Sequence, residues 1–141
     1  CNPWLFVCWQ CGNANDSYPS QFDVILTENL FGDVISDEGS VIGGSIGLLA
    51  SASVGDQFAM FEPIHGSFPQ GAGKDIANPI AAILSASMLL EHFGMFEEAE
   101  CIQKAVDKAL ESNVTTSDLN PSSTYGTNAV GDYIAESIAK N

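Results

Sequence analysis

The stretch Asn29-Leu30-Phe31-Gly32-Asp33-Val34-Ile35-Ser36-Asp37 follows an apolar run at residues 22–27. The run is rich in β-branched and apolar side chains, which favours a buried strand, and residues 30–41 favour a helix. Asp33 and Asp37 would then share one helix face, because positions i and i+4 lie about 5–6 Å apart. Two carboxylates that close suit a hard divalent cation such as Mg²⁺ or Mn²⁺. The pair therefore has two interpretations, a metal site or an exposed acidic surface.

The rest of the chain alternates between strand-like and helix-like segments, which predicts an α/β fold. Asn78 followed by Pro79 is a typical helix start, with Asn at the N-cap, and Thr127 is expected to cap the last helix. The helix from residue 79 to 93 is apolar on nearly every side, so it should be covered on most faces. The expected strands are residues 48–50 and 59–62, and the further helices are residues 97–112 and those after Thr127.

Composition excludes several functional classes. The chain has 141 residues, 18 of them acidic, four lysines and no arginine, for a net charge of −14. Nucleic-acid binding needs a basic face, so that class is excluded. No apolar run reaches the roughly 18 residues of a membrane helix, so no membrane partner is expected. A dicarboxylate substrate is usually clamped by guanidinium groups, which this chain cannot supply.

Residues 1–21 differ in character from the rest. Cys8-Trp9-Gln10-Cys11 is a CxxC motif, which could be a redox pair or half a zinc site. The sequence has no second CxxC and no spaced histidine pair, so a chance pairing is the favoured interpretation. The chain also lacks an initiating methionine, and we expect it to be a piece of a longer cytoplasmic protein.

A second group of motifs lies between residues 61 and 79. Phe61-Glu62-Pro63-Ile64-His65-Gly66-Ser67 is followed by Ala72-Gly73-Lys74-Asp75-Ile76-Ala77-Asn78-Pro79. Together with residues 29–37 and Gly44-Ser45-Ile46-Gly47-Leu48, these motifs resemble the β-decarboxylating dehydrogenases of the isocitrate and isopropylmalate family. The resemblance covers about 120 residues, with several motifs in the correct order. It implies the C-terminal part of that family's α/β fold, which binds a dinucleotide without a Rossmann fingerprint.

The resemblance assigns roles to individual residues. Asp33 and Asp37 match the two metal-binding aspartates, and Asp33 also lies against the substrate. Alone, His65 could be a loop histidine, Glu62 a buried structural carboxylate, and Lys74 and Asp75 surface charges. The residues that match the NAD-binding loop are Glu62, His65, Gly66, Ser67, Gln70, Gly71, Ala72, Gly73, Lys74, Asp75, Ile76, Ala77 and Asn78.

The amino-acid sequence of residues 22–79 is most similar to the 3-isopropylmalate branch of the family, which serves leucine biosynthesis. The resemblance implies oxidative decarboxylation of 3-isopropylmalate to 2-oxoisocaproate by a homodimer with NAD and Mg²⁺ or Mn²⁺. Gln70 stands where many members have an aspartate that binds the NAD ribose; it can bond a hydroxyl without repelling a 2′-phosphate. A sibling 2-hydroxy dicarboxylate substrate (isocitrate, homoisocitrate or tartrate) and an inactive truncated product remain alternatives.

The same resemblance implies how the chain is divided. Residues 1–21 form a leader unlike the family, residues 22–50 the end of the dimer-forming and metal-site domain, and residues 51–141 the second half of the nucleotide domain. The catalytic tyrosine and lysine of the family would lie upstream, so no catalytic residue is assigned here. We expect the chain alone to be inactive.

Overall fold

The structure, a computed structural model, describes residue 20 and residues 24–140. The chain divides into two compact units, Cys1–Gly44 and Ser45–Asn141. The expected boundary between the metal-site and nucleotide domains lies nearby, at residue 50, and remains a prediction. The CxxC motif lies outside the described residues, as does the leader apart from Ser20.

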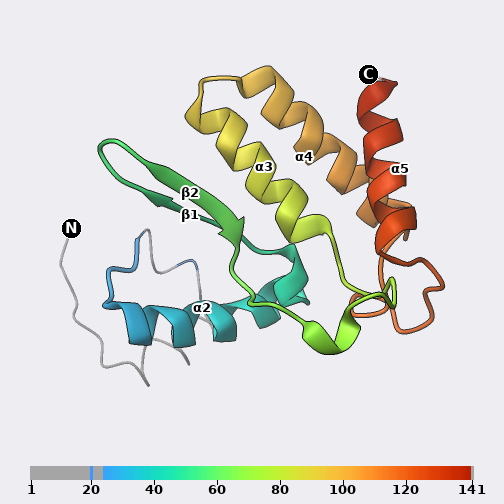
Figure 1. The fold of residues 1–141 in the computed structure, drawn as a ribbon, viewed down its shortest axis with the longest axis horizontal. Helices are drawn as coiled ribbons and strands as arrows, with labels where there is room; N and C mark the ends of the chain where they lie inside the picture. Colours follow the sequence, from blue (N-terminus) through green and yellow to red (C-terminus); the bar gives the residue numbers. More distant parts are fainter. Residues whose placement is uncertain (1–19, 21–23, 141) are drawn as a thin grey trace. The chain divides into compact units, whose positions relative to one another are not determined.

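The described part of the first unit consists of an extended segment and helix α2 (Asn29–Gly43), drawn in blue to cyan in Figure 1. The helix confirms the prediction for residues 30–41. The buried strand predicted at residues 22–27 is wrong over its described part, because residues 24–28 have no regular structure. Val24 is 86% and Leu26 94% exposed. A strand needs a neighbour to bond its backbone groups, and none of the described strands pairs with this segment.

Three helices form the core of the second unit. Helix α4 (Phe96–Glu111) packs against both α3 (Ile80–His92) and α5 (Thr127–Ala139) (Figure 1). Helix α4, which the sequence predicts at residues 97–112, turns Ala99 and Val106 inward. The buried cluster consists of Ile80, Ala105, Val106, Ala109, Val114, Val130 and Ile134.

The turns after α3 and α4 have the same geometry. Gly94 (φ 75°) and Asn113 (φ 56°) each adopt the left-handed conformation, one residue beyond the C-cap of a helix. Met95 N–H then bonds Leu90 O at 2.9 Å, and Val114 N–H bonds Ala109 O at 2.9 Å. These bonds satisfy helix carbonyls that would otherwise lack partners. The sequence predicts this helix up to residue 93, and it ends at His92 with Phe93 as its C-cap.

A hairpin of two antiparallel strands, β1 (Ala50–Val54) and β2 (Ala59–Pro63), packs against α3. The prediction of a strand at residues 59–62 is confirmed. The strand predicted at residues 48–50 begins only at Ala50, because the chain first forms the short 3-10 helix η2 (Ile46–Leu48). Helices and a small sheet together agree with the predicted α/β class.

Helix α3 is exposed along one side. Leu89 is 39% exposed, and Ala82 and Ala86 are exposed on the same side. Its other sides are buried or half-buried, mainly against α4, the hairpin and η2, so the prediction that α3 is covered on most faces is confirmed apart from this one side. No helix among the described residues is both long and apolar enough to cross a membrane.

Candidate functional site

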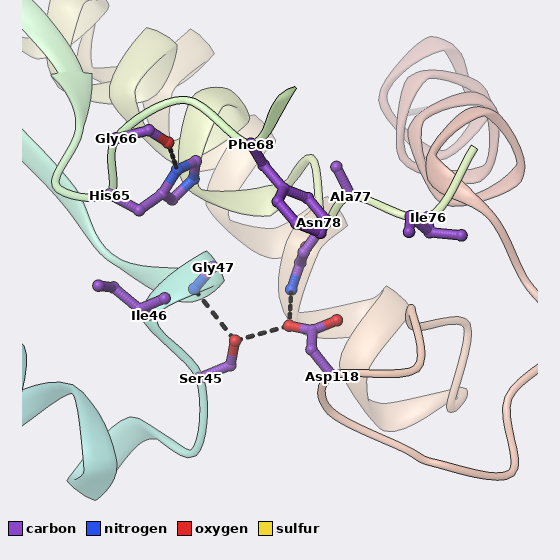
Figure 2. A pocket seen from close by; sticks show the side chains of 10 residues that line it. All are labelled: Ser45, Ile46, Gly47, His65, Gly66, Phe68, Ile76, Ala77, Asn78 and Asp118. Atoms are coloured by element: carbon purple, nitrogen blue, oxygen red, sulfur yellow. Dashed lines mark hydrogen bonds between the residues drawn. The ribbon is translucent and has the colours of Figure 1, made fainter. Parts of the chain in front are cut away.

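A cavity of about 260 Å³ opens in the second unit, between the η2 turn and the loop that follows β2. Three chain segments line it: residues 45–47, residues 65–68 and residues 76–78. Figure 2 shows these side chains around the cavity, with Asp118 closing one side. The lining residues are Ser45, Ile46, Gly47, His65, Gly66, Phe68, Ile76, Ala77, Asn78 and Asp118. The wall is mostly apolar with a few polar groups, as is usual for small-molecule sites.

Gly47 and Asn78 bring two of the segments into contact. Gly47 is buried, and a Cβ atom there would lie 2.9 Å from Asn78 Cβ and 3.1 Å from its Cγ. Only a residue without a side chain allows the turn to approach this closely. Asn78 Oδ1 also accepts a bond from Ile80 N–H at 3.0 Å. The carboxamide thus bonds the start of α3 as expected of a cap, but the N-cap position belongs to Pro79 and the helix begins at Ile80, one residue later than predicted.

Asp118 joins segments that are far apart in sequence. Its Oδ2 accepts bonds from Ser45 Oγ at 2.6 Å and from Asn78 Nδ2 at 3.0 Å (Figure 2). Its Oδ1 accepts a bond from Thr116 Oγ1 at 2.5 Å. Burial by itself raises the pKa of this carboxyl, but the hydrogen bonds from Ser45, Thr116 and Asn78 outweigh burial and hold the pKa below its ordinary value. The carboxylate is therefore an internal anion of the cavity wall.

His65 is fixed by its own loop. Its Nδ1 donates to the Gly66 carbonyl oxygen at 3.0 Å, which leaves Nε2 as an acceptor in the neutral imidazole. The ring lines the cavity, across from Asp118 in the view of Figure 2. His65 can thus bond a ligand donor while its orientation is held by Gly66.

A second cavity of about 300 Å³ shares Ile76 and Ala77 with the first. Beside it, Asp75 adopts a left-handed backbone conformation (φ 55°). Its Oδ1 accepts a bond from Asn128 N–H at 2.8 Å, and its carbonyl oxygen accepts one from Thr127 N–H at 3.2 Å. The positive end of α5 is therefore already occupied by an internal carboxylate. The other lining residues are Gly71, Gly73, Asp75, Thr127 and Asn128.

The expected cap at Thr127 is wrong in its detail. The N-cap residue of α5 is Gly126, and Thr127 Oγ1 instead donates to the Ala77 carbonyl oxygen at 2.6 Å. Asp75 takes over the capping role across a gap of 53 residues in sequence. This pair of contacts anchors the loop before α3 to the start of α5.

The predicted cofactor residues separate into four groups. His65, Gly66 and Asn78 line the first cavity, Gly71, Gly73 and Asp75 line the second, and Ile76 and Ala77 line both. The remaining ones lie on neither wall: Glu62, Ser67, Gln70, Ala72 and Lys74. Glu62 is exposed on β2, which removes the alternative that it is a buried structural carboxylate.

Asp33 and Asp37 lie one turn apart on α2, and both are exposed. Their carbonyl oxygens accept bonds from Ser36 Oγ and Ser40 Oγ. No ion pair or hydrogen bond engages either carboxylate within the described part of the chain. Nor do the described residues gather three or more metal-ligating side chains at any point. Mg²⁺ usually takes only one or two protein carboxylates and fills its shell with water and substrate, so the pair fits such an ion.

Five residues of the first cavity were not predicted: Ser45, Ile46, Gly47, Phe68 and Asp118. The glycine-rich motif at residues 44–48 points to the first three, because a glycine in a turn often marks a close approach. Asp118 lies 40 residues beyond Asn78 in a Thr-Thr-Ser-Asp turn. Nothing in that local sequence distinguishes it from any turn aspartate.

Comparison with known proteins identifies the family to which the chain belongs. Residues 17–134 match the isocitrate/isopropylmalate dehydrogenase family. The chain is 52% identical over 124 residues to 3-isopropylmalate dehydrogenase from Bacteroides fragilis, covering 86% of this chain and 35% of that protein. A Thermotoga maritima enzyme of the same name is 52% identical over 123 residues, covering 85% and 34%.

Solved structures agree. Isocitrate dehydrogenase from Methylococcus capsulatus superposes with a TM-score of 0.90 at 39% identity, covering 94% of this chain and 40% of that one. A β-decarboxylating dehydrogenase from Thermococcus kodakarensis gives 0.82 at 39% identity, covering 96% and 40%. The chain spans about a third of the length of the curated relatives it matches. On its motifs, its fold and these matches, the chain belongs to the isocitrate/isopropylmalate dehydrogenase family.

Proposed function

We propose that this chain supplies the adenosine-binding pocket and two metal ligands of an NAD-dependent, β-decarboxylating dehydrogenase. The whole enzyme would convert 3-isopropylmalate to 2-oxoisocaproate in the cytoplasm. The observation that carries the proposal is the first cavity, because residues of three of the recognised motifs meet in its wall. The relatives' names support this choice of substrate over its siblings.

The size of the cavity suits part of a dinucleotide. Its volume of about 260 Å³ lies just below the roughly 300–1,000 Å³ of sites that hold a drug-sized ligand. Ile46, Phe68 and Ile76 offer apolar surface to a flat base, while His65 Nε2 offers an acceptor. The pocket would hold the adenosine half, and the nicotinamide half would extend beyond the described cavity.

Asp33 and Asp37 would hold Mg²⁺ or Mn²⁺, with Asp33 also lying against the substrate. When bound, the cation acts as a Lewis acid on a carbonyl oxygen, and NAD accepts a hydride. The two carboxylates supply negative charge and a fixed spacing of one helical turn. The chain has no arginine, so the groups that clamp the substrate carboxylates, and the acid and base for proton transfer, would come from outside these 141 residues.

The surface of α2 is compatible with the homodimer that the family resemblance implies. Leu30 is 68%, Val34 50% and Ile42 55% exposed on this helix, an amount of apolar surface that normally lies against another protein surface. Either a further part of the enzyme or a second subunit would cover it.

A chimeric enzyme tests the proposal. Residues 24–140 of this chain would replace the matching segment of the Bacteroides fragilis relative, and NADH formation would be followed by absorbance. We expect turnover that requires both 3-isopropylmalate and Mg²⁺, and none from the 141-residue chain alone. A chimera that folds and dimerises but reduces no NAD would overturn the proposal; turnover with isocitrate instead would overturn the substrate.

A further inference from the structure

The walls of the first cavity come from segments that are not adjacent in sequence, so the backbone alone does not fix the distance between them. The η2 turn forms one wall and the residues before α3 form another, and 30 or so residues separate them in sequence. The direct contact between them is the packing of Asn78 on Gly47. A pocket built in this way keeps its width only if something ties the walls together.

The Asp118 carboxylate links the two walls by hydrogen bonds. One carboxylate oxygen, Oδ2, accepts from Ser45 Oγ on the first wall and from Asn78 Nδ2 on the second. Ser45 Oγ in turn accepts from Gly47 N–H at 3.0 Å. A continuous chain of bonds therefore runs from the Gly47 backbone, through Ser45 and Asp118, to the Asn78 carboxamide (Figure 2).

The same bonds limit what Asn78 can do. Its Nδ2 is engaged by Asp118 and its Oδ1 by Ile80 N–H. Both ends of the carboxamide thus have internal partners, and the side chain serves to hold the wall in place. The Asp118 carboxylate is itself held from the far side by Thr116 Oγ1.

We propose that Asp118 is the positioning residue of the nucleotide pocket, setting the distance between its walls by bonding Ser45 and Asn78 at once. This inference rests on the proposed function, since it concerns the affinity of the pocket for the adenosine half of NAD. Asp118 acts through the wall residues and not by touching the reacting atoms.

Two substitutions separate position from charge. Asp118→Ala removes all three bonds and releases the walls. Asp118→Asn can keep its oxygen toward Ser45 and Asn78 and turn its amino group toward the Thr116 hydroxyl, which can accept. The tie then survives without the negative charge. Asp132→Ala is the matched control, because Asp132 is exposed on α5 and has no bond within the described residues.

The test is calorimetric titration of the 141-residue chain and its variants with ADP-ribose and with NAD, with circular dichroism and thermal melting of each variant. At a temperature where all are folded, we expect Asp118→Ala to lose about tenfold or more in affinity. Asp118→Asn should stay within about threefold of the wild type, and Asp132→Ala should be unchanged. Should Asp118→Ala fail to fold, Ser45→Ala removes one end of the tie and is expected to weaken binding by a smaller factor.

The outcomes distinguish the two proposals. Wild-type binding that is equally strong in Asp118→Ala, or in Ser45→Ala where the first does not fold, overturns the positioning role and leaves the proposed function standing. A loss in Asp118→Asn as large as in Asp118→Ala contradicts the geometric account, because it makes the charge decisive. Absence of wild-type binding overturns the nucleotide pocket itself, and with it this inference.

Discussion

Helix α2 and the helices α3 to α5 use their apolar residues in opposite ways. In α2 the buried side chains that the structure describes are Ile35 and Ser40, while Leu30, Phe31 and Val34 are all at least 41% exposed. In α3 to α5, Ile80, Ala109 and Val130 are completely buried. Residues 45–140 form a buried core of their own, and the cavity lies among them. Helix α2, by contrast, carries two carboxylates on a solvent-exposed surface. A nucleotide pocket can therefore be a local property of this chain, whereas a metal site needs partners that α2 does not have within the described residues.

The largest expected effect concerns the acidic pair. In the chimeric enzyme described above, Asp33→Asn and Asp37→Asn should each lower turnover by about 100-fold or more. Loss of residues that merely orient metal ligands already costs 10–100-fold. Titration of activity with Mg²⁺ should show weaker metal binding at the same time. Glu38→Gln, on a different face of the same helix, is the control; a loss as large as that of the aspartates would make the effect one of general charge.

Core truncation tests the contrast in burial. Ile134 is 1% exposed in the closed cluster, so Ile134→Ala should lower the free energy of unfolding of the chain by about 2–5 kcal/mol. Ile42 on α2 is 55% exposed, and Ile42→Ala should change the free energy of unfolding by less than about 0.5 kcal/mol. Urea unfolding measures both. Equal losses would mean that α2 is packed as tightly as the helical core.

Two glycines at α5 should respond with opposite signs. A Cβ at Gly126 would clash with Asp75 Oδ2 and would lie 2.5 Å from the Asp75 carbonyl oxygen, so Gly126→Ala should destabilise the chain by about 1–3 kcal/mol. Gly131, inside α5, faces open space, and Gly131→Ala should stabilise by about 0.5–1 kcal/mol through helix propensity. Thermal melting would show shifts in both directions. A rise for Gly126→Ala would remove the proposed anchoring of the loop by Asp75.

The smallest expected effect is on the pH dependence of stability. The pKa of Asp118 is lower in the folded chain than its ordinary value, because hydrogen bonds from Ser45, Thr116 and Asn78 outweigh burial. Ionised Asp118 therefore stabilises the fold above its unfolded pKa of about 3.9, and this is lost as the pH falls through the folded pKa. The stability difference between the wild type and Asp118→Asn should shrink on acidification across this range in urea titrations. A constant difference would show that Asp118 is not bonded as described.

The sequence predicts elements whose signals are local. Helix α3 follows from its long apolar run and from Asn78-Pro79 at its start, α4 and α5 follow from apolar periodicity, and β2 follows from its run of apolar residues. The segment at residues 24–28 has the composition of a strand but not the structure, because pairing depends on a neighbour and not on propensity. Composition could not show that Asp75 caps α5, since the two groups lie 53 residues apart.

The residues of the candidate site likewise include some with local sequence signals and some without. The loop residues that line the cavities, such as His65 and Ala77, lie in motifs that can be recognised from the sequence alone. Asp118 could not be found in this way, because its role is defined by bonds to Ser45 and Asn78, which are 73 and 40 residues distant. The metal role of Asp33 and Asp37 remains a prediction from spacing and family resemblance.

The most direct test of this account is an NMR titration of the 141-residue chain, first with AMP and then, separately, with Mg²⁺. The account predicts that AMP shifts the amide signals of Gly47, Gly66 and Ala77, while Mg²⁺ alone shifts those of α2 only at millimolar concentration. If AMP leaves the cavity signals unmoved while Mg²⁺ binds α2 tightly, the assignment of a self-sufficient nucleotide pocket and an incomplete metal site is contradicted.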